Sequence, residues 1–292
     1  MKKVAFASGK GGAGKTTLSM SFHKFLGNDS VFADCDVDAA DAFLIIEEKK
    51  LNSLPFISGY KYEIDPKLCI KCRKCLSSCK FGAIRENGSI FIESMSCEGC
   101  GVCQDICEAC AITKNPNHCG NLFISRTNFS TTMTYARLSP GEDNSGKLSH
   151  QVRNASDLIM DMENKQYVVV DCPPGIGCPL MASLTGIDLL VVIIESSLSG
   201  FSDAKRLVEV ARKIGLKTIA VLNKAGLDSA IDYGIRDYLH KTDILLAGVI
   251  PFDEKATVLL SNKQLLIDHE PFKENLEIIF ANICQYAQKE SS

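Results

Sequence analysis

Short runs that are apolar at almost every position recur along the chain, and stretches with helical spacing lie between them. A strand that is buried on both faces of a parallel sheet shows such a continuous apolar run. In residues 16–26 and 200–215, apolar side chains recur every three or four positions, as on one face of a helix. The pattern predicts a doubly wound, mostly parallel α/β sheet. The predicted strands are residues 4–7, 31–33, 167–170, 189–194, 218–222 and 244–250.

The pattern changes between residues 60 and 117, where cysteines crowd together and apolar runs shrink to two or three residues. This stretch also repeats internally, because Cys69 and Cys97 begin the same cysteine spacing. We therefore expect residues 60–117 to form a small domain inserted between two parts of the sheet domain, residues 1–59 and 118–292. The elements expected after the insertion are strands at residues 122–124 and 133–138 and a loop at 139–147.

Residues 9–16 match the phosphate-binding pattern G-x-x-x-x-G-K-[ST]. The motif follows a predicted strand and opens a predicted helix, which is the context that it requires. Glycines let backbone amides turn toward the phosphates, and the helix N-terminus adds a partial positive charge. Lys15 is expected to reach the β- and γ-phosphates and Thr16 to bind Mg²⁺, so ATP and Mg²⁺ are the predicted ligands. The predicted nucleotide-binding residues of this loop are Gly9, Gly11, Gly12, Ala13, Gly14, Lys15, Thr16 and Thr17.

A second lysine in the loop, Lys10, makes residues 10–17 similar to the deviant Walker A motif of the MinD/ParA/Mrp/nitrogenase-iron-protein group of dimeric ATPases. In that group the early lysine crosses the dimer interface. The resemblance therefore implies ATP hydrolysis on a P-loop NTPase sheet, by a homodimer in which Lys10 reaches the partner's nucleotide. The catalytic residues that the resemblance implies are Lys10, Lys15, Asp36 and Asp171.

Two further segments carry the same resemblance. Residues 34–36 follow the second predicted strand, where the group has its first switch, and residues 168–175 resemble its Walker B strand and second switch. By this resemblance Asp36 positions the attacking water, Asp171 supports Mg²⁺, and Asn223 contacts adenine. A carboxylate at the end of a buried strand is costly unless it is used, which favours a functional role for Asp171.

Composition limits the compartment and the partners. The formal net charge of −3 gives no electrostatic footprint for nucleic acid or for an anionic membrane. No apolar run approaches the length that spans a bilayer, and the apolar N-terminal stretch is too short for a signal peptide. We therefore expect a cytoplasmic protein that binds neither nucleic acid nor membrane. In that reducing compartment, 14 cysteines indicate metal ligation rather than disulfides.

Eight of the cysteines form two complete runs of the bacterial-ferredoxin type, C-x2-C-x2-C-x3-C. In two-cluster ferredoxins the fourth cysteine of each run binds the other cluster. Zinc is the competing metal, but zinc sites use four ligands in two pairs rather than two runs of four. We therefore predict a small α+β bacterial-ferredoxin domain with two [4Fe–4S] clusters, whose binding supplies most of its stability. One cluster is predicted to be held by Cys69, Cys72, Cys75 and Cys107, and the other by Cys97, Cys100, Cys103 and Cys79.

Among the other cysteines, Cys178 lies 7 residues after Asp171. The nitrogenase iron protein has a cluster-ligating cysteine at this offset, but Asn144 stands here in the loop that resembles the site of its second ligand. A redox or ligand role and ordinary packing both stay open for Cys178. The five histidines show no ligand spacing, and we expect them at the surface or at helix caps. The cysteines expected as small buried side chains are Cys35, Cys172 and Cys284.

Three functions fit these features. The favoured one is an ATPase dimer whose nucleotide state controls electron transfer through two [4Fe–4S] clusters toward a redox or iron–sulfur protein partner. The second is a cluster carrier or assembly ATPase, although the C-terminal Cys-x2-Cys of the similar Mrp-type proteins is absent. The third and least favoured is a MinD-like spatial organiser, which would need a basic amphipathic C-terminal helix. Residues 272–283 do form an apolar stripe, but the opposite side of the helix carries Glu274 and Glu277 with Lys273 and is not a cationic face. This pattern favours a helix that packs on the core.

Overall fold

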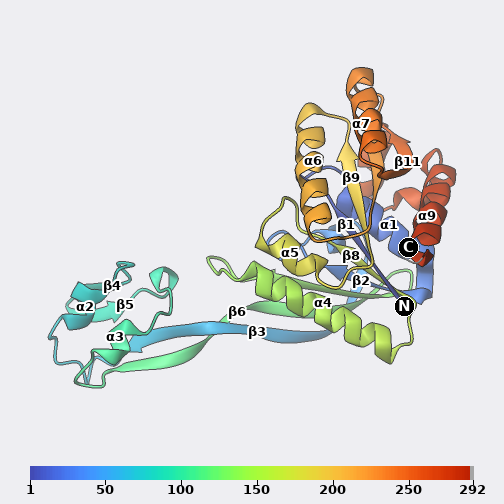
Figure 1. The fold of residues 1–292 in the computed structure, drawn as a ribbon. Coiled ribbons are helices and arrows are strands. Elements are labelled where there is room, and N and C mark those ends of the chain that lie inside the picture. Colours follow the sequence, from blue (N-terminus) through green and yellow to red (C-terminus); the bar gives the residue numbers. More distant parts are fainter. Residues whose placement is uncertain (290–292) are drawn as a thin grey trace. The chain divides into compact units, whose positions relative to one another are not determined.

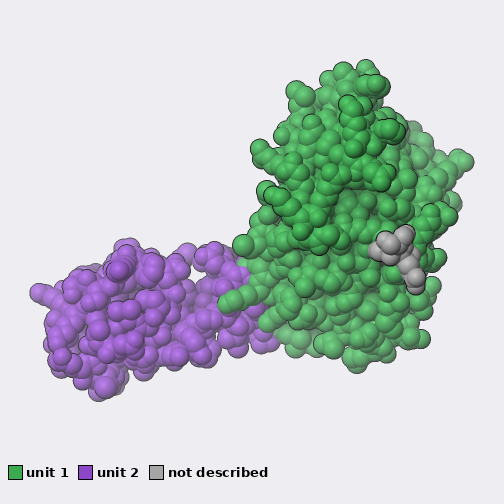
Figure 2. Space-filling model, in the orientation of Figure 1, with its two compact units in different colours: residues 1–54, 122–137, 145–292 green, residues 55–121, 138–144 purple. Residues whose placement is uncertain are grey.

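The computed structural model describes residues 1–289 and contains two compact units (Figure 2). The larger unit comprises residues 1–54, 122–137 and the chain from residue 145 onward. The smaller unit comprises residues 55–121 and 138–144. The insertion predicted at residues 60–117 lies within the first of these two segments, and the smaller unit also takes in the short segment after β7. Within the described part of the chain, no helix is both long and apolar enough to cross a membrane.

A nine-stranded sheet has the strand order β11–β10–β9–β1–β8–β2–β7–β6–β3 (Figure 1). Neighbouring strands from β11 through β7 are all parallel, which confirms the predicted α/β fold. The carboxyl ends of parallel strands meet at one edge, and there Asp34 of β2 is paired in register with Asp171 of β8. The strands are β1 (Lys2–Ala7), β2 (Ser30–Asp34), β3 (Glu48–Ile64), β6 (Ile112–Thr127), β7 (Thr132–Leu138), β8 (Tyr167–Asp171), β9 (Leu189–Glu195), β10 (Thr218–Ala225) and β11 (Leu245–Pro251).

Helices pack on the sheet and on one another. The helices of the larger unit are α1 (Lys15–Leu26), α4 (Ser145–Met162), α5 (Cys178–Leu184), α6 (Leu198–Lys213), α7 (Ser229–Lys241), α8 (Lys255–Ser261) and α9 (Phe272–Gln288). Helix α1 contacts α9, α4 contacts α5, and α6 contacts α7 (Figure 1). The ring of Phe22 in α1 lies 5.4 Å from Phe6 of β1 and 5.3 Å from Phe280 of α9, measured between centroids. The apolar stripe of α9 is therefore buried in the core, and the prediction of a core-packing helix is confirmed.

The smaller unit contains little regular structure and a small core. Its own elements are α2 (Lys74–Ser78), α3 (Val102–Asp105), β4 (Ile84–Asn87) and β5 (Ser89–Ile92), and the last two pair antiparallel. The buried side chains at its centre are Tyr62, Cys75, Ile84, Ile90 and Ile112, and cysteines pack around them. A unit of this size with so few apolar side chains gains little stability from burial alone.

Strands β3 and β6 are the largest departure from the predicted elements. They contain 17 and 16 residues, whereas the apolar pattern predicted only residues 122–124 of the second one. Most side chains of β3 are exposed, and Phe56 and Tyr62 are its buried ones. A strand held chiefly by backbone pairing to its neighbour shows no apolar alternation, so periodicity cannot reveal it.

His23 is fully buried in α1, which makes the expectation of a surface or capping position wrong for this histidine. Its Nδ1 hydrogen-bonds with Ser30 Oγ at 2.7 Å, and its Nε2 with Thr131 Oγ1 at 2.7 Å. Both ring nitrogens thus have partners in the neutral form. Burial, together with nearby Lys165, lowers the pKa of His23 to about 3. The ring therefore stays neutral in the folded protein.

We expect His23 to make stability fall in mildly acidic solution. The unfolded chain binds a proton at this ring near pH 6.5, but the folded chain does not until about pH 3, so stability is lost as the pH falls between these values. Between pH 7 and 5 the loss amounts to about 2 kcal/mol. Urea unfolding of wild type and His23→Gln at both pH values measures it. Contributions from carboxylates cancel in the comparison, and equal pH dependence in the two proteins would contradict the assignment.

Candidate functional site

The loop between β1 and α1 lines an open cavity with Gly11, Gly12 and Gly14. Asn223 Nδ2 donates to the Ala13 carbonyl at 2.8 Å, and Lys224 Nζ donates to the Gly12 carbonyl at 2.7 Å. These bonds provide both loop carbonyls with donors from β10. Gly14 has φ 91°, and a Cβ there would lie 2.3 Å from Asn223 Nδ2, so only glycine fits. No side chain caps α1, which leaves its first amides free for phosphate oxygens.

At the end of this loop, Lys15 and Thr16 both contact Asp171, the last residue of β8. Lys15 Nζ lies 2.9 Å from Asp171 Oδ1, and Thr16 Oγ1 donates to Asp171 Oδ2 at 2.6 Å. Lys15 is nearly buried and Asp171 completely so. Mg²⁺ prefers oxygen ligands and commonly keeps several waters beside one or two protein oxygens and the substrate phosphates. The adjacent hydroxyl and carboxylate fit that donor set, in the roles predicted for Thr16 and Asp171.

Further carboxylates surround Lys15 at the same edge of the sheet. The cavity, of about 200 Å³, is lined by both Asp36 and Asp41 as well as by the phosphate loop. Burial raises the pKa of Asp36 to about 6, and burial with the neighbouring Asp171 raises the pKa of Asp34. Asp36 thus lies where the sequence placed it. Asp41 was not predicted, because it does not directly follow β2. Its position at the cavity depends on the path of the turn after that strand.

A second cavity, of about 210 Å³, adjoins the first and shares Gly12, Gly14 and Thr17 with it. Its other walls are mostly apolar and include Asn223, the residue predicted to contact adenine. One polar and one apolar compartment beside a phosphate loop fit the phosphates and the base of a nucleotide. Sequence analysis missed the residues from Ile250 to Asp253 in this wall. The signal was available, since Ile250 ends the last predicted strand and the other three residues directly follow it.

Lys10 contacts its own chain in this structure. Its Nζ lies 3.2 Å from Glu195 Oε2 and donates to Ser197 Oγ at 3.2 Å and to Ser199 Oγ at 3.1 Å. Lys10 and Glu195 are both partly exposed, and such an ion pair contributes at most about 1 kcal/mol. The contact can therefore be exchanged for another at small cost.

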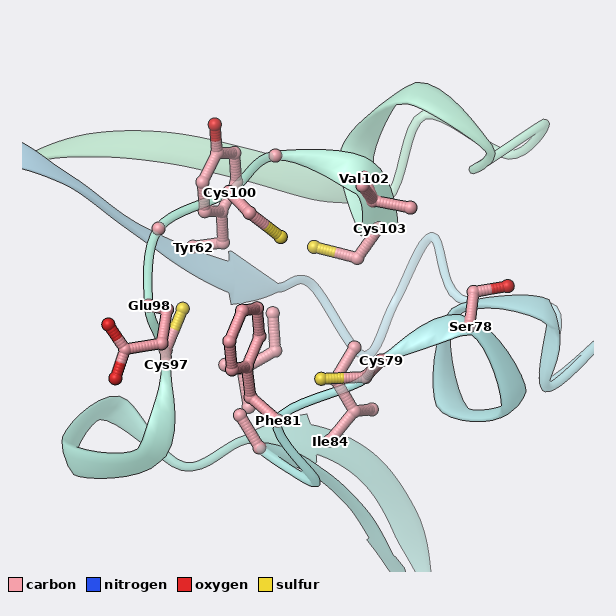
Figure 3. A pocket seen from close by; sticks show the side chains of 14 residues that line it. Tyr62, Ser78, Cys79, Phe81, Ile84, Cys97, Glu98, Cys100, Val102 and Cys103 are labelled. Carbon is pink, nitrogen blue, oxygen red and sulfur yellow. The ribbon is translucent and has the colours of Figure 1, made fainter.

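The eight cysteines of the two runs line two separate cavities in the smaller unit. Each cavity takes three cysteines from one run and the fourth cysteine of the other run, so Cys79 lies with the second run and Cys107 with the first. One cavity is lined by Cys69, Cys72, Cys75 and Cys107, and the other by Cys79, Cys97, Cys100 and Cys103. Figure 3 shows the sulfur atoms of the second set arranged around one space. These are the two ligand sets that the ferredoxin spacing predicts.

The number of cysteines at each cavity equals the number of ligands that one [4Fe–4S] cube requires. Within residues 1–289, no group of three or more histidine, cysteine or acidic side chains is close enough together to hold one metal ion. In a [4Fe–4S] cube each cysteine binds a different iron, so the four sulfurs surround a larger space than a zinc ion needs. Four cysteines around each cavity fit that requirement.

The remaining cysteines divide by burial. Cys178 is exposed at the start of α5, where its backbone packs against Gly146 of α4. Cys35 and Cys172 are fully buried at the ends of β2 and β8, as expected for small apolar side chains, and Cys284 is half-buried. Burial raises the pKa of Cys172 to about 12, so this thiol stays protonated and inert.

Residues 4–266 match the family model of the CobQ/CobB/MinD/ParA nucleotide binding domain. An uncharacterized protein of Methanocaldococcus jannaschii, MJ0578, is 32% identical over 287 residues, which cover 97% of each chain. Two relatives match in part. The carbon monoxide dehydrogenase accessory protein CooC of Rhodospirillum rubrum is 36% identical over 93 residues, or 31% of this chain and 34% of CooC. The pyruvate synthase subunit PorD of M. jannaschii is 42% identical over 53 residues, or 18% of this chain and 62% of PorD.

Solved structures show the same fold. MinD of Pyrococcus horikoshii, in complex with Mg-ADP, has a TM-score of 0.57 at 16% identity, covering 98% of this chain and 97% of that one. McdA of Cyanothece, in complex with ATP, has a TM-score of 0.59 at 15% identity, covering 100% and 98%. Since the family model spans both the phosphate loop and the Asp171 strand, the chain belongs to the CobQ/CobB/MinD/ParA family of P-loop nucleotide-binding proteins.

Proposed function

We propose that this protein is an ATP-hydrolysing dimer that carries two [4Fe–4S] clusters and couples its nucleotide state to electron transfer toward a protein partner. The observation that supports this function most strongly is that one chain contains both a phosphate loop and two cavities with four cysteines each. Each cavity combines three cysteines of one run with the fourth cysteine of the other. Neither feature alone requires the other. Their presence together is what the proposal explains.

The nucleotide half of the proposal rests on the two adjoining cavities. Loop amides and Lys15 would hold the phosphates, Thr16 and Asp171 would hold Mg²⁺, and Asn223 would face the base. Bound Mg²⁺ would neutralise phosphate charge during hydrolysis. The pKa of about 6 for Asp36 lets it accept a hydrogen bond from a water at neutral pH, as its proposed role requires. Lys10, in the deviant Walker A position, would leave Glu195 and reach the partner's nucleotide.

Contacts within each unit, joined only by the chain between Glu142 and Gly146, support coupling between the two halves of the proposal. In the larger unit, Gly146 packs against the backbone of Cys178, which begins α5 shortly after the second switch segment. Four residues earlier in the chain, within the smaller unit, Glu142 Oε1 lies 3.6 Å from Lys61 Nζ. Lys61 Nζ also donates to the carbonyl of Cys97, a proposed cluster ligand, at 2.9 Å. A shift of the switch on nucleotide exchange would thus reach the Cys97 site along the chain.

EPR of the reduced protein without nucleotide, with ADP and with ATP tests this function. The expected result is two interacting [4Fe–4S]⁺ signals whose shape or redox midpoint changes with ATP. Protein reconstituted with iron and sulfide that shows no cluster signal would overturn the proposal. Signals that are identical in all three nucleotide states would leave the clusters in place and overturn the coupling.

Removing the Glu142 charge is expected to weaken the coupling without removing either site. Coupling is reciprocal, so it is measured as the ratio of ATP affinities of the oxidised and the reduced protein. In Glu142→Gln the coupling free energy should fall by about 1 kcal/mol, because Lys61 loses its link to the loop before α4. Glu63→Gln, an exposed change in the same unit, is the control. An unchanged ratio in Glu142→Gln would exclude this route.

The likeness to CooC and PorD supports a role associated with metalloproteins and favours a second candidate, an ATPase that assembles or delivers a metal centre. Incubation of the cluster-loaded protein with an apo-acceptor, with and without ATP, separates the two functions. ATP-dependent transfer of iron and sulfide to the acceptor favours delivery. Retention of both clusters through repeated reduction and oxidation favours electron transfer.

A further inference from the structure

The two cysteine runs carry opposite charges. Residues 66–80, around the first run, contain five basic residues and no acidic one. Residues 93–108, around the second run, contain four acidic residues and no basic one. The basic residues are Lys67, Lys71, Arg73, Lys74 and Lys80, and all five are exposed. Four of them lie between Lys67 and Lys74, in the segment that carries Cys69 and Cys72 of one cavity, whereas Lys80 follows Cys79, which lines the other cavity. A net charge of −3 for the whole chain therefore conceals a local cationic segment beside the cavity lined by Cys69 and Cys72.

The backbone gives an independent sign that two of these charges are selected. Lys71 and Arg73 have φ of 56° and 61°, in the left-handed region that favours glycine. The equivalent positions of the second run are Gly99 and Gly101, with φ of 66° and 84°. A non-glycine residue in this conformation costs about 1 kcal/mol or more. The second run avoids this strain by having glycine at both positions. The strain retained in the first run therefore favours a functional role for the side chains of Lys71 and Arg73.

Ion pairs cancel only part of this positive charge. Arg73 Nε lies 2.9 Å from Glu86 Oε2, and Lys74 pairs with Glu108. Lys67 and Lys71 have no acidic partner within the described residues. Exposed pairs are weak and exchange readily for contacts with another molecule.

The cationic segment contributes Ile70, Cys72 and Arg73 to the lining of the cavity that holds the first set of cysteines. Cys72 and Arg73 both line that cavity and are exposed. Leu68 and Ile70, which lie between Lys67 and Lys71 in the sequence, have exposed fractions of 54% and 67%, which are high for apolar residues. Exposed apolar side chains with a charged rim, directly beside a buried site, are typical of a surface that another protein covers.

We propose that the face formed by Lys67, Leu68, Ile70, Lys71 and Arg73 docks an acidic electron-carrier protein next to Cys72. This inference rests on the proposed function, because the acidic carrier would be the electron-transfer partner of the cluster that the first set of cysteines is proposed to hold. Charge complementarity selects an acidic partner and speeds its association, and the apolar centre limits the distance of approach. The acidic second run disfavours docking of the same partner there.

Binding of the cluster-loaded protein to an acidic plant-type [2Fe–2S] ferredoxin, as a probe, tests the surface. We expect affinity to fall steeply between low and physiological salt, and to fall about tenfold in a Lys71→Gly, Arg73→Gly double variant at low salt. The melting temperature of that variant should stay equal or rise, because glycine relieves the left-handed strain. Lost affinity in a protein of equal or higher stability cannot be ascribed to misfolding.

The second run offers a matched control. In a Glu98→Gln, Asp105→Asn double variant, which removes two acidic charges from the equivalent segment, affinity for the ferredoxin should be unchanged or higher. Equal loss in both double variants, or binding that does not respond to salt, would overturn the docking surface. So would equally tight binding of basic cytochrome c, of duplex DNA or of anionic vesicles. If both EPR cluster signals are present but the ferredoxin does not bind, this inference alone fails. If the signals are absent, the proposed function fails and the inference with it.

Discussion

Replacing Cys79 by alanine is expected to empty the site of the second cysteine run, although Cys79 belongs to the first run. Its cavity is the one lined by Cys97, Cys100 and Cys103. A site with three thiolates in place of four binds its cluster weakly, so bound iron should fall by about half. Cys107→Ala should have the same effect on the other site. Iron and sulfide analysis with EPR of the reduced protein measures both losses.

Double variants show which cysteines share a cluster. If the sets cross, Cys79→Ala combined with Cys100→Ala removes no more iron than either change alone, because both act on one site. Cys79→Ala combined with Cys72→Ala then removes iron from both sites. An uncrossed arrangement gives the reverse, which would contradict the proposed ligand sets. Cys110→Ala, an exposed cysteine outside both cavities, should retain all the iron.

Where sequence analysis anticipated the site, the chemistry depends on residues at short, fixed spacing. The phosphate loop closes within eight residues between a strand and a helix, so its geometry is local and its motif predicts it. The cysteine runs are equally local. Even the crossing of Cys79 and Cys107 follows from the direction of the fourth thiolate in each run. The parallel sheet was predictable because strands buried on both faces stay apolar throughout.

Where prediction stopped, the structure depends on contacts between distant segments. Strands β3 and β6 stabilise each other by pairing, so exposed sequences form long strands. Lys61 reaches Glu142 only because segment 138–144 folds with the smaller unit. His23 looked like a surface residue of α1, yet Ser30 and Thr131 provide it with partners inside the core. None of these pairings leaves a periodic signal in the sequence.

The two lysines of the phosphate loop show this limit at the catalytic centre. Lys15 is tied to Asp171 by a nearly buried ion pair, whereas its motif position predicts contact with the β- and γ-phosphates. Lys10 instead contacts the partly exposed Glu195 at the end of β9 in its own chain. Lys15→Ala and Lys10→Ala should each lower ATP hydrolysis by at least about a hundredfold, through loss of charge beside the phosphates. Only the Lys15 change should also destabilise the fold, by about 3–5 kcal/mol, because it leaves Asp171 buried and unpaired.

Mixing two inactive subunits should restore hydrolysis if Lys10 acts on the partner's nucleotide. A heterodimer of Lys10→Ala and Asp36→Ala chains contains one site with its own Asp36 and the partner's intact Lys10. Random pairing of equal amounts then restores about a quarter of the wild-type sites. If Lys10 serves its own chain, every site in the mixture lacks one of the two residues and activity stays at the background of the separate variants. Hydrolysis rates of the variants alone and after mixing, at equal total protein, therefore decide between a site completed by a second subunit and a site complete in one chain.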